Sequence, residues 1–272
     1  MPELPEVEVY REKIEHEGLY KKITDIKVLD KSLLSDISEK EFTNALANQQ
    51  FTGVRRIGKY LGIELNGGDC LEVHFGMTGS VSFYDQSDRP EYEKIVFGLE
   101  SGKKLSYVDP RKFGHLALRN DMEAIRKEHD LGPDALSIKK ADFVEILRQS
   151  GAMIKTALTN QSLLCGIGNV YADEILFQSR IHPQIPANEL SREKLEDVYA
   201  EMKKVLDTSI RYIRYKLEKS DYGKARKSLP GNYILSNRKA RADCPGSCEG
   251  KLKTIKISGR TTYFCPACQQ KD

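Results

Sequence analysis

The dominant spacing of apolar residues changes near residue 120. From Lys22 to Arg119, short segments alternate apolar and polar positions and are rich in β-branched and aromatic residues. Turn signals such as Asn66-Gly67-Gly68 and Ser101-Gly102 separate these segments, so the pattern predicts antiparallel strands joined by hairpins. The clearest strand segments are 22–28, 60–65, 70–75, 80–84, 94–99 and 104–108.

Helical spacing also occurs before this region and once within it. Over residues 3–16, Val7, Tyr10 and Ile14 share one side of a predicted helix. A shorter helix is expected over residues 39–49. Several short strands in series with flanking helices indicate an antiparallel β-sandwich.

Beyond Asp121 the spacing is helical, which makes the fold class α+β. Ser191 is expected to cap a long helix that has one apolar face. The other helical segments are 121–131, 140–150 and 169–179. We expect an N-terminal domain at 1–120, a linker at 121–136, a helical domain at 137–235 and a C-terminal module at 236–272.

Composition is that of a globular protein. The 272 residues are 39% hydrophobic and 31% charged. No stretch approaches the roughly 18 apolar residues that cross a bilayer. The first residues are acidic and contain no apolar run, so we expect no signal peptide, no membrane partner and a cytoplasmic protein.

Charge is distributed unevenly along the chain. The net charge is only +3, but basic residues are concentrated after Lys203, and the preceding part is mildly acidic. A basic module of this kind is typical of a surface that binds a polyanion. A basic surface that is simply solvated fits the charge equally well.

Four cysteines near the C-terminus form two closely spaced pairs around a predicted hairpin. Four thiolates in this arrangement reach one tetrahedral Zn²⁺, whereas two disulfides would be unusual in a cytoplasmic chain. Arg260 lies at the predicted hairpin turn, where it would bind the phosphate backbone of a nucleic acid. The expected ligands of one structural zinc are Cys244, Cys248, Cys265 and Cys268.

A glycine motif, Gly166-Ile167-Gly168, precedes the helix expected at Asn169. Free N–H groups at the start of a helix bind phosphate well, and the asparagine side chain adds a donor. A tight turn into the helix explains the same glycines, so the motif alone leaves both interpretations open.

The first residues also allow two interpretations. If Met1 is removed, Pro2 carries a secondary amine whose pKa of about 8 leaves more of it neutral, and therefore nucleophilic, than a lysine. Its attack on an aldehyde-like carbon gives an iminium ion directly, and Glu3 could shuttle protons. Alternatively, Pro2 and Pro5 simply start a helix whose dipole favours Glu3 and Glu6.

Several motifs occur together and in one order along nearly the whole chain. They are PELPEVE at 2–8, RRIGKYL at 55–61, HFGMTG at 74–79, DPRKFG at 109–114, GIGNVYADEILF at 166–177 and SGRTTYFCPAC at 258–268. In this combination the chain resembles the formamidopyrimidine-DNA glycosylase family, which is related to endonuclease VIII.

The resemblance implies a bifunctional DNA repair enzyme. Such an enzyme removes oxidised purines, such as 8-oxoguanine and formamidopyrimidines, and then nicks the strand by β,δ-elimination. The implied architecture is an N-terminal β-sandwich, a helix-two-turn-helix domain and a zinc finger hairpin. The implied partner is damaged double-stranded DNA, bound by a monomer that associates with the nucleoid in a prokaryote.

The resemblance also implies catalytic roles. Pro2 would attack the sugar C1′ and form the Schiff base, and Glu3 would act as general acid and base. Glu6 would support that site, Lys59 would assist elimination and bind phosphate, and Arg260 would contact the phosphate or the lesion. Relative to the family segment, Lys59 follows the arginine pair by one residue more than expected.

Six further residues match DNA contacts of the family. An apolar wedge and an aromatic ring would replace the stacking of an extruded nucleotide, and a guanidinium would satisfy its orphaned partner base. As isolated residues, Met77 and Phe113 would more often belong to a hydrophobic core. The gap-filling residues would be Met77, Arg111 and Phe113, and the contacts to phosphates or lesion His74, Lys155 and Asn169.

Two departures from the family pattern leave the lesion preference open. Residues 90–94 contain no histidine where a KHDH-like run is common, and residues 219–230 lack the Gly-Gly-Thr/Ser stretch that covers a flipped purine. An endonuclease VIII-like glycosylase or an abasic-site lyase is therefore the alternative. A non-catalytic DNA-binding protein or an RNA-binding zinc protein would have no use for Pro2, Glu3 and Lys59 together.

Overall fold

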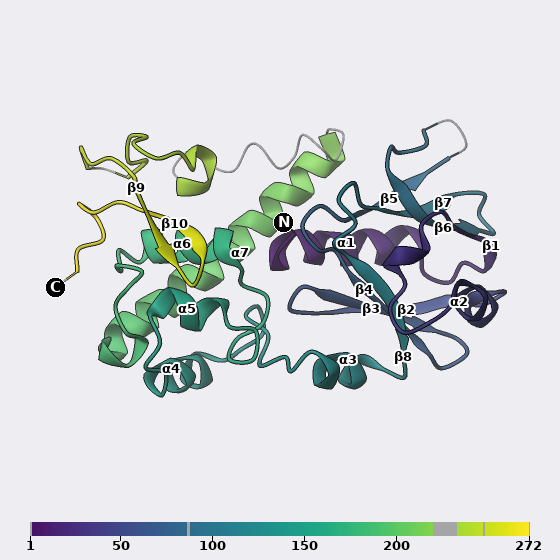
Figure 1. The fold of residues 1–272 in the computed structure, drawn as a ribbon, viewed down its shortest axis with the longest axis horizontal. Helices are drawn as coiled ribbons and strands as arrows, with labels where there is room; N and C mark the ends of the chain where they lie inside the picture. Colours follow the sequence, from purple (N-terminus) through teal and green to yellow (C-terminus); the bar gives the residue numbers. More distant parts are fainter. Residues whose placement is uncertain (1, 86–87, 220–232, 247, 272) are drawn as a thin grey trace. The chain divides into compact units, whose positions relative to one another are not determined.

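The structure, a computed structural model, describes residues 2–85, 88–219, 233–246 and 248–271 (Figure 1). The chain forms two compact units, Met1–Asp130 and Leu131–Asp272. The division falls inside the segment 121–136, whose first part is helical and belongs to the N-terminal unit. Within the described ranges, no helix is long and apolar enough to cross a membrane.

Two four-stranded antiparallel sheets form the N-terminal unit, in the orders β1-β6-β7-β5 and β2-β3-β4-β8. The predicted strands lie close to their expected positions, and β2 and β8 complete the second sheet. The strands are β1 (Ile23–Val28), β2 (Phe51–Ile57), β3 (Tyr60–Leu65), β4 (Cys70–His74), β5 (Ser80–Tyr84), β6 (Glu93–Leu99), β7 (Lys104–Val108) and β8 (His115–Arg119).

The core of this unit contains aromatic side chains from strands and from the intervening helix. Phe51 meets Phe97 with ring centroids 5.9 Å apart in an edge-to-face arrangement, and Phe42 lies 6.4 Å from the same ring. Phe42 and Phe51 are fully buried. Burial of each such ring stabilises the fold by about 1.5–3 kcal/mol.

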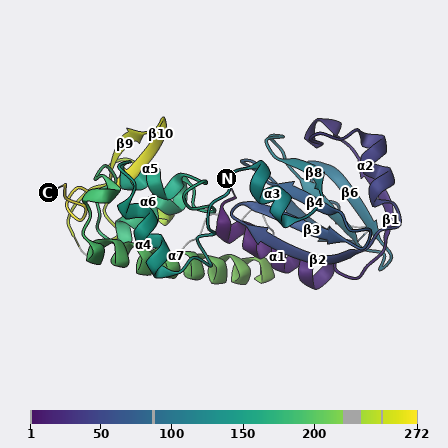
Figure 2. The same cartoon turned by 90° about the horizontal axis from the view of Figure 1, so that it is seen from below.

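Three helices flank the sheets. α1 (Leu4–Glu17) contacts β2, β3 and β5, and therefore both sheets, and it carries Pro5 in its first turn as expected. α2 (Glu39–Leu46) lies against β1. α3 (Met122–Glu128) lies beside β2 and β8 (Figure 2). A short 3-10 turn, η1 (Lys31–Leu33), precedes α2.

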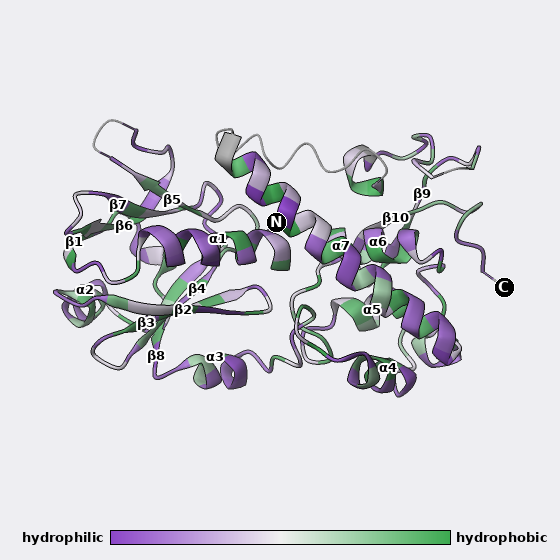
Figure 3. Cartoon of the chain, turned by 180° about the vertical axis from the view of Figure 1, so that it is seen from behind, coloured by the Kyte–Doolittle hydropathy of each residue, from purple (hydrophilic) through white to green (hydrophobic). Residues whose placement is uncertain are grey.

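Helices form most of the C-terminal unit. Ser191 Oγ accepts a hydrogen bond from the Lys194 backbone N–H, which confirms the predicted cap of the long helix. That helix packs against α4 and α6, and polar and apolar residues alternate along it (Figure 3). The helices are α4 (Lys140–Arg148), α5 (Ile154–Thr159), α6 (Asn169–Gln178) and α7 (Arg192–Lys219), with 3-10 turns η2 (Ala187–Glu189) and η4 (Ile234–Asn237).

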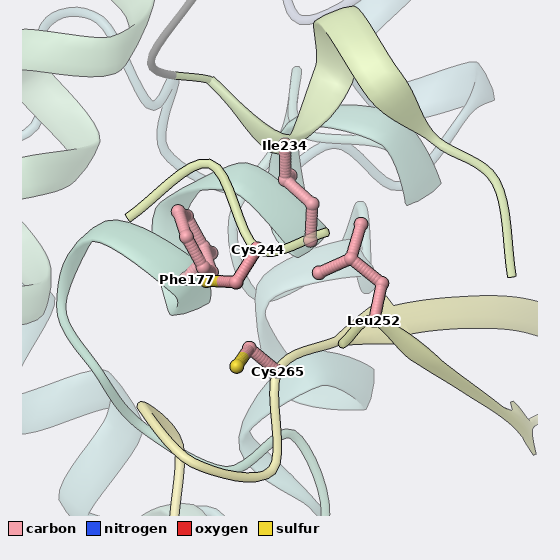
Figure 4. Close-up of a cluster of buried hydrophobic side chains, with 5 residues drawn as sticks. All are labelled: Phe177, Ile234, Cys244, Leu252 and Cys265. Atoms are coloured by element: carbon pink, nitrogen blue, oxygen red, sulfur yellow. The ribbon is translucent and has the colours of Figure 1, made fainter. Parts of the chain in front are cut away.

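A two-stranded hairpin, β9 (Lys253–Ile257) and β10 (Arg260–Phe264), lies between the cysteine pairs. Ser258 and Gly259 form its two-residue turn with φ of +47° and +75°, the left-handed pair that hairpin loops favour. At the open end of the hairpin, Phe177 of α6 and Ile234 of η4 pack with Leu252, Cys244 and Cys265 (Figure 4). This cluster attaches the finger to the helices.

Glu174 of α6 is buried completely beneath the segment that leads to the finger. Its carboxylate accepts hydrogen bonds from the Leu235 backbone N–H at 3.1 Å and from Gln178 Nε2 at 2.7 Å. Burial raises the pKa of Glu174 to about 7, although these hydrogen bonds oppose the shift. The folded state therefore holds a proton that the unfolded chain releases at lower pH.

We predict that the C-terminal unit loses stability as pH rises from about 4.5 through 7. The glutamate of the unfolded chain ionises first, so the folded state binds one more proton in this window. The free energy of unfolding should therefore fall by about 3 kcal/mol across it. Glu174→Gln should flatten this dependence in denaturant unfolding at pH 5 and pH 8. Glu145→Gln, on the exposed side of α4, is the control, and parallel profiles for wild type and Glu174→Gln would contradict the prediction.

Candidate functional site

The start of α1 combines a helix cap with a buried carboxylate. Glu3 is the N-cap residue, and its backbone N–H donates to Glu6 Oε2 at 3.0 Å in a reciprocal capping box. Pro2 and Glu3 are both buried, and Glu3 has no exposed surface. These residues therefore start a helix as expected, and the buried Glu3 directly follows Pro2 in the chain.

The turn that carries Lys59 is attached to the same helix. Gly58 and Lys59 form the two-residue loop between β2 and β3, and Gly58 takes a φ of +57° that favours glycine. Arg56 donates from Nε to Glu8 of α1 at 2.6 Å and from Nη1 to the Gly58 carbonyl at 3.0 Å. Only 6% of the Arg56 side chain is exposed. A guanidinium thus links the helix of Glu3 to the loop of Lys59.

A second group of predicted residues lies on two loops that Asp109 organises. The Asp109 carboxylate is fully buried and accepts hydrogen bonds from the Phe113 and Gly114 backbone N–H groups, each at 2.9 Å. It also accepts from the Arg111 backbone N–H and from the Thr78 hydroxyl. Since Thr78 follows Met77, one carboxylate holds the loop of Met77 beside the loop of Arg111 and Phe113.

These loops expose the apolar side chains that they carry. Met77 is 41% exposed and Phe113 is 54% exposed, so neither belongs to the core. The Arg111 guanidinium lies 4.8 Å from the centroid of the Phe113 ring. Exposed apolar side chains are common singly, but here two lie on loops held together by a buried hydrogen-bonded group.

Glycines allow the two loops to approach each other. A side chain on Gly76, whose φ is +51°, would place its Cβ 2.2 Å from the Phe113 carbonyl carbon. A Cβ on Gly114 would lie 1.8 Å from Tyr107 Oη. Tyr107 in turn donates to the His74 carbonyl at 2.9 Å. The backbone itself therefore sets the spacing of the exposed side chains.

His74 lies at the end of β4 in a row of aromatic rings. Its ring stacks on Tyr60 with centroids 4.6 Å apart and lies 5.2 Å from the ring of His115. Burial, together with the charges of His115 and Lys59, lowers the pKa of His74 to about 4. At neutral pH this ring is uncharged, so it can contact a phosphate only through a neutral hydrogen bond.

In the C-terminal unit, Lys155 and Asn169 both bind the finger hairpin. Lys155 is 2% exposed, and its Nζ lies 2.6 Å from Thr262 Oγ1 of β10 and 2.6 Å from Asp173 Oδ1. Asn169 Nδ2 donates to the Thr261 carbonyl at 3.0 Å. The structure therefore brings Lys155 and Asn169 together with the strand that begins at Arg260, and it leaves Arg260 exposed.

Asp173 is the centre of this arrangement, and sequence reasoning missed it. Its buried carboxylate contacts Lys155, pairs with Arg238 Nη2 at 2.6 Å and accepts the Tyr263 backbone N–H at 3.1 Å. An acidic residue on an otherwise apolar helix face was the available signal, since buried acids need partners. Asp109 gave a similar signal, because aspartate at the start of a loop often binds following N–H groups.

The four cysteine sulfurs fit one zinc ion. Their separations are 3.7 Å for Cys244 and Cys268, 3.6 Å for Cys248 and Cys265, and 3.2 Å for Cys248 and Cys268. These distances exclude disulfides, and they are close to the edge of about 3.8 Å expected for four sulfurs around a tetrahedral zinc. The predicted single structural zinc is confirmed, because the four sulfurs lie close enough together to share one ion.

A β-sandwich unit with an acidic N-terminal cap, followed by a helical unit with a four-cysteine finger, defines a class of zinc-containing proteins that bind DNA. Three family models match this chain. They are described as the formamidopyrimidine-DNA glycosylase N-terminal domain (residues 1–116), the formamidopyrimidine-DNA glycosylase H2TH domain (residues 131–219) and a zinc finger found in FPG and IleRS (residues 246–271). The chain belongs to the formamidopyrimidine-DNA glycosylase family.

Individual relatives agree with this assignment over the full chain. The chain is 34% identical to the formamidopyrimidine-DNA glycosylase of Desulfitobacterium hafniense and 33% identical to that of Herpetosiphon aurantiacus, covering 99% of this chain and 100% of each relative. The Lactococcus lactis enzyme bound non-covalently to DNA containing an AP site superposes with a TM-score of 0.84. MutM in complex with DNA containing carbocyclic 8-oxo-G superposes with a TM-score of 0.83. These two structures are 28% and 27% identical, and each match covers 99% of this chain and 100% of the other.

We predict that Cys265→Ser lowers the tightly bound zinc by one ion per chain. The loss removes the constraint that closes the finger, so proteases should cut 244–268 faster. Metal analysis after gel filtration and limited proteolysis measure the two effects. Cys165→Ala, which changes a buried cysteine outside the cluster, should leave the zinc content unchanged, and an equal loss in both variants would contradict the assignment.

Proposed function

We propose that this protein is a bifunctional DNA glycosylase and AP lyase that excises oxidised purines during base-excision repair. It acts as a monomer on damaged double-stranded DNA, in the cytoplasm or at the nucleoid. The observation that carries the mechanism is that the residue after Pro2 is Glu3, which is fully buried at the N-cap of α1. Binding alone would not require a secondary amine next to a buried carboxylate.

In the proposed reaction, removal of Met1 frees the Pro2 amine. The amine attacks C1′ of the damaged nucleotide, the glycosidic bond breaks, and an iminium ion links Pro2 to the sugar. Glu3 transfers the protons needed for base loss and sugar opening, and Glu6 fixes the backbone of Glu3. Lys59, held by the Arg56 contacts, assists the elimination that cuts the strand.

The exposed loops supply the second part of the proposal. Extrusion of a nucleotide costs a few kcal/mol and leaves a gap in the duplex. Met77 and Phe113 fill the gap from one side, and Arg111 reaches the orphaned base. His74 contacts the backbone as a neutral group, and the exposed Arg260 contributes a charged contact.

The contacts of Lys155 and Asn169 with the finger hairpin change their proposed roles. Both side chains bind β10 next to Arg260, so we assign them the positioning of the finger as well as any contact with DNA. The loop 220–230, on which the predicted lesion preference partly rests, lies outside the described residues. Duplexes carrying 8-oxoguanine, a formamidopyrimidine, an oxidised pyrimidine or an abasic site distinguish a purine glycosylase from the endonuclease VIII-like alternative.

We predict that borohydride traps a covalent adduct between Pro2 and damaged DNA. Reduction of the iminium ion makes the link permanent, so Pro2→Gly or an added residue before Pro2 should reduce trapping at least tenfold. Electrophoresis of labelled duplex measures the adduct, and peptide mass spectrometry locates it. Pro5→Ala, which changes the other proline of the first turn, should still be trapped. Undiminished trapping in both altered N-termini would overturn the mechanism.

We predict that Phe113→Ala slows base excision from duplex DNA roughly tenfold to a hundredfold without lowering thermal stability. Stacking of one aromatic side chain on a base contributes about 1–3 kcal/mol, and the side chain is largely exposed in the free protein. Single-turnover excision measures the effect. Leu29→Ala removes another apolar side chain, 49% exposed, from the same unit and should not change the rate. Equal rates for Phe113→Ala and wild type would exclude the wedge role.

A further inference from the structure

The side chains of Glu72, His115 and His129 meet on one face of the β2-β3-β4-β8 sheet. The proposed reaction assigns no role to these three residues. Glu72 and His74 are alternate residues of β4, and His115 pairs with His74 across the neighbouring strand β8. His129 follows α3, the helix that covers this part of the sheet. Residues from two strands and a helix end therefore converge at one point of the N-terminal unit.

The convergence is on a single carboxylate oxygen. Glu72 Oε1 lies 2.8 Å from His115 Nε2 and 2.6 Å from His129 Nε2. Glu72 has no exposed surface, whereas the His115 and His129 side chains are 24% and 20% exposed. The three ligand atoms all lie within 4.8 Å of one another.

We infer that Glu72, His115 and His129 bind a divalent transition-metal ion of the zinc type, separate from the four-cysteine site. Two imidazole nitrogens and one carboxylate oxygen are a common three-ligand set for such ions. An ion about 2.1 Å from each ligand would hold them roughly 3.4 Å apart, so the two hydrogen bonds need to lengthen by less than about 1 Å. Each imidazole would then carry its remaining proton on Nδ1.

The surroundings of the three residues fit this inference. Arg119 Nε donates to the second carboxylate oxygen, Glu72 Oε2, at 2.9 Å, which orients Oε1 toward the histidines. The Tyr60 ring stacks on His129 with centroids 4.3 Å apart and fixes the plane of that imidazole. Groups that hold the ligands in this way are typical of protein metal sites.

The partial exposure of both histidines leaves the remaining coordination positions open to water. The ion would join the end of α3 to β8 and would stabilise the N-terminal unit. Because the donor atoms are nitrogen and a single carboxylate oxygen, Zn²⁺, Co²⁺ and Ni²⁺ should bind, whereas Mg²⁺ should not. Metal binding at these three residues does not depend on the glycosylase activity.

The test uses the full-length protein with its four-cysteine zinc in place and without DNA. After weakly bound metal is removed on a chelating resin, equilibrium dialysis with Zn²⁺ and Co²⁺ measures the additional ions bound. We expect one further ion per chain and a rise in melting temperature of about 5 °C or more at saturating metal. The bound Co²⁺ should show ligand-field bands without a thiolate charge-transfer band, which separates this site from the cysteines.

Two single variants and a matched control decide the assignment. His129→Ala and His115→Ala should each weaken binding of the further ion at least tenfold and abolish the metal-dependent rise in melting temperature. His16→Ala, which removes an exposed histidine from α1, should bind the ion as the wild type does. Absence of a further ion in the wild type, equal binding in all variants, or a thiolate band for the added Co²⁺ would each overturn the inference.

Discussion

The buried carboxylate of Asp109 is the interaction on which the proposed DNA-contacting loops depend. A charged group without solvent is tolerated only when hydrogen bonds replace water, and four donors from two loops do so here. Hydrogen bonds to a charged group contribute about 1.5–3 kcal/mol each, so the loops gain a fixed geometry from a residue that is itself fully buried. The exposed side chains of Met77 and Phe113 are placed by hydrogen bonds to Asp109 from the Thr78 hydroxyl and from the Phe113 backbone N–H.

The same principle organises the C-terminal unit. Asp173 is buried on α6 and receives Lys155, Arg238 and a β10 backbone N–H. The zinc closes the finger, and the Asp173 contacts attach it to α5 and α6. Removing one partner of such a buried pair is strongly destabilising, on the order of 3–5 kcal/mol, because it leaves an uncompensated charge. The position of Arg260 therefore depends on residues that are distant in sequence and lie outside the motif that contains it.

Local patterns predicted much of the fold, and the exceptions have physical causes. Turn residues and alternation located six strands, and Ser191 located the start of α7, because these signals act over a few residues. β2 was less evident since it carries Arg55 and Arg56 beside each other, and Arg56 is buried only because Glu8 of α1 pairs with it. Helix α5 is six residues long, too short for a helical period to be distinct.

The sequence by itself determined the family, the strand-rich and helical parts, the zinc ligands and the chemical possibilities of the first residues. Covalent order and residue type are sufficient for these, because a motif keeps its spacing whatever surrounds it. Only the tertiary structure decided that Phe113 is exposed, that Lys155 is buried against Asp173, and that Glu72 meets two histidines. Burial and long-range pairing arise when distant segments pack together, so no short stretch of sequence contains them.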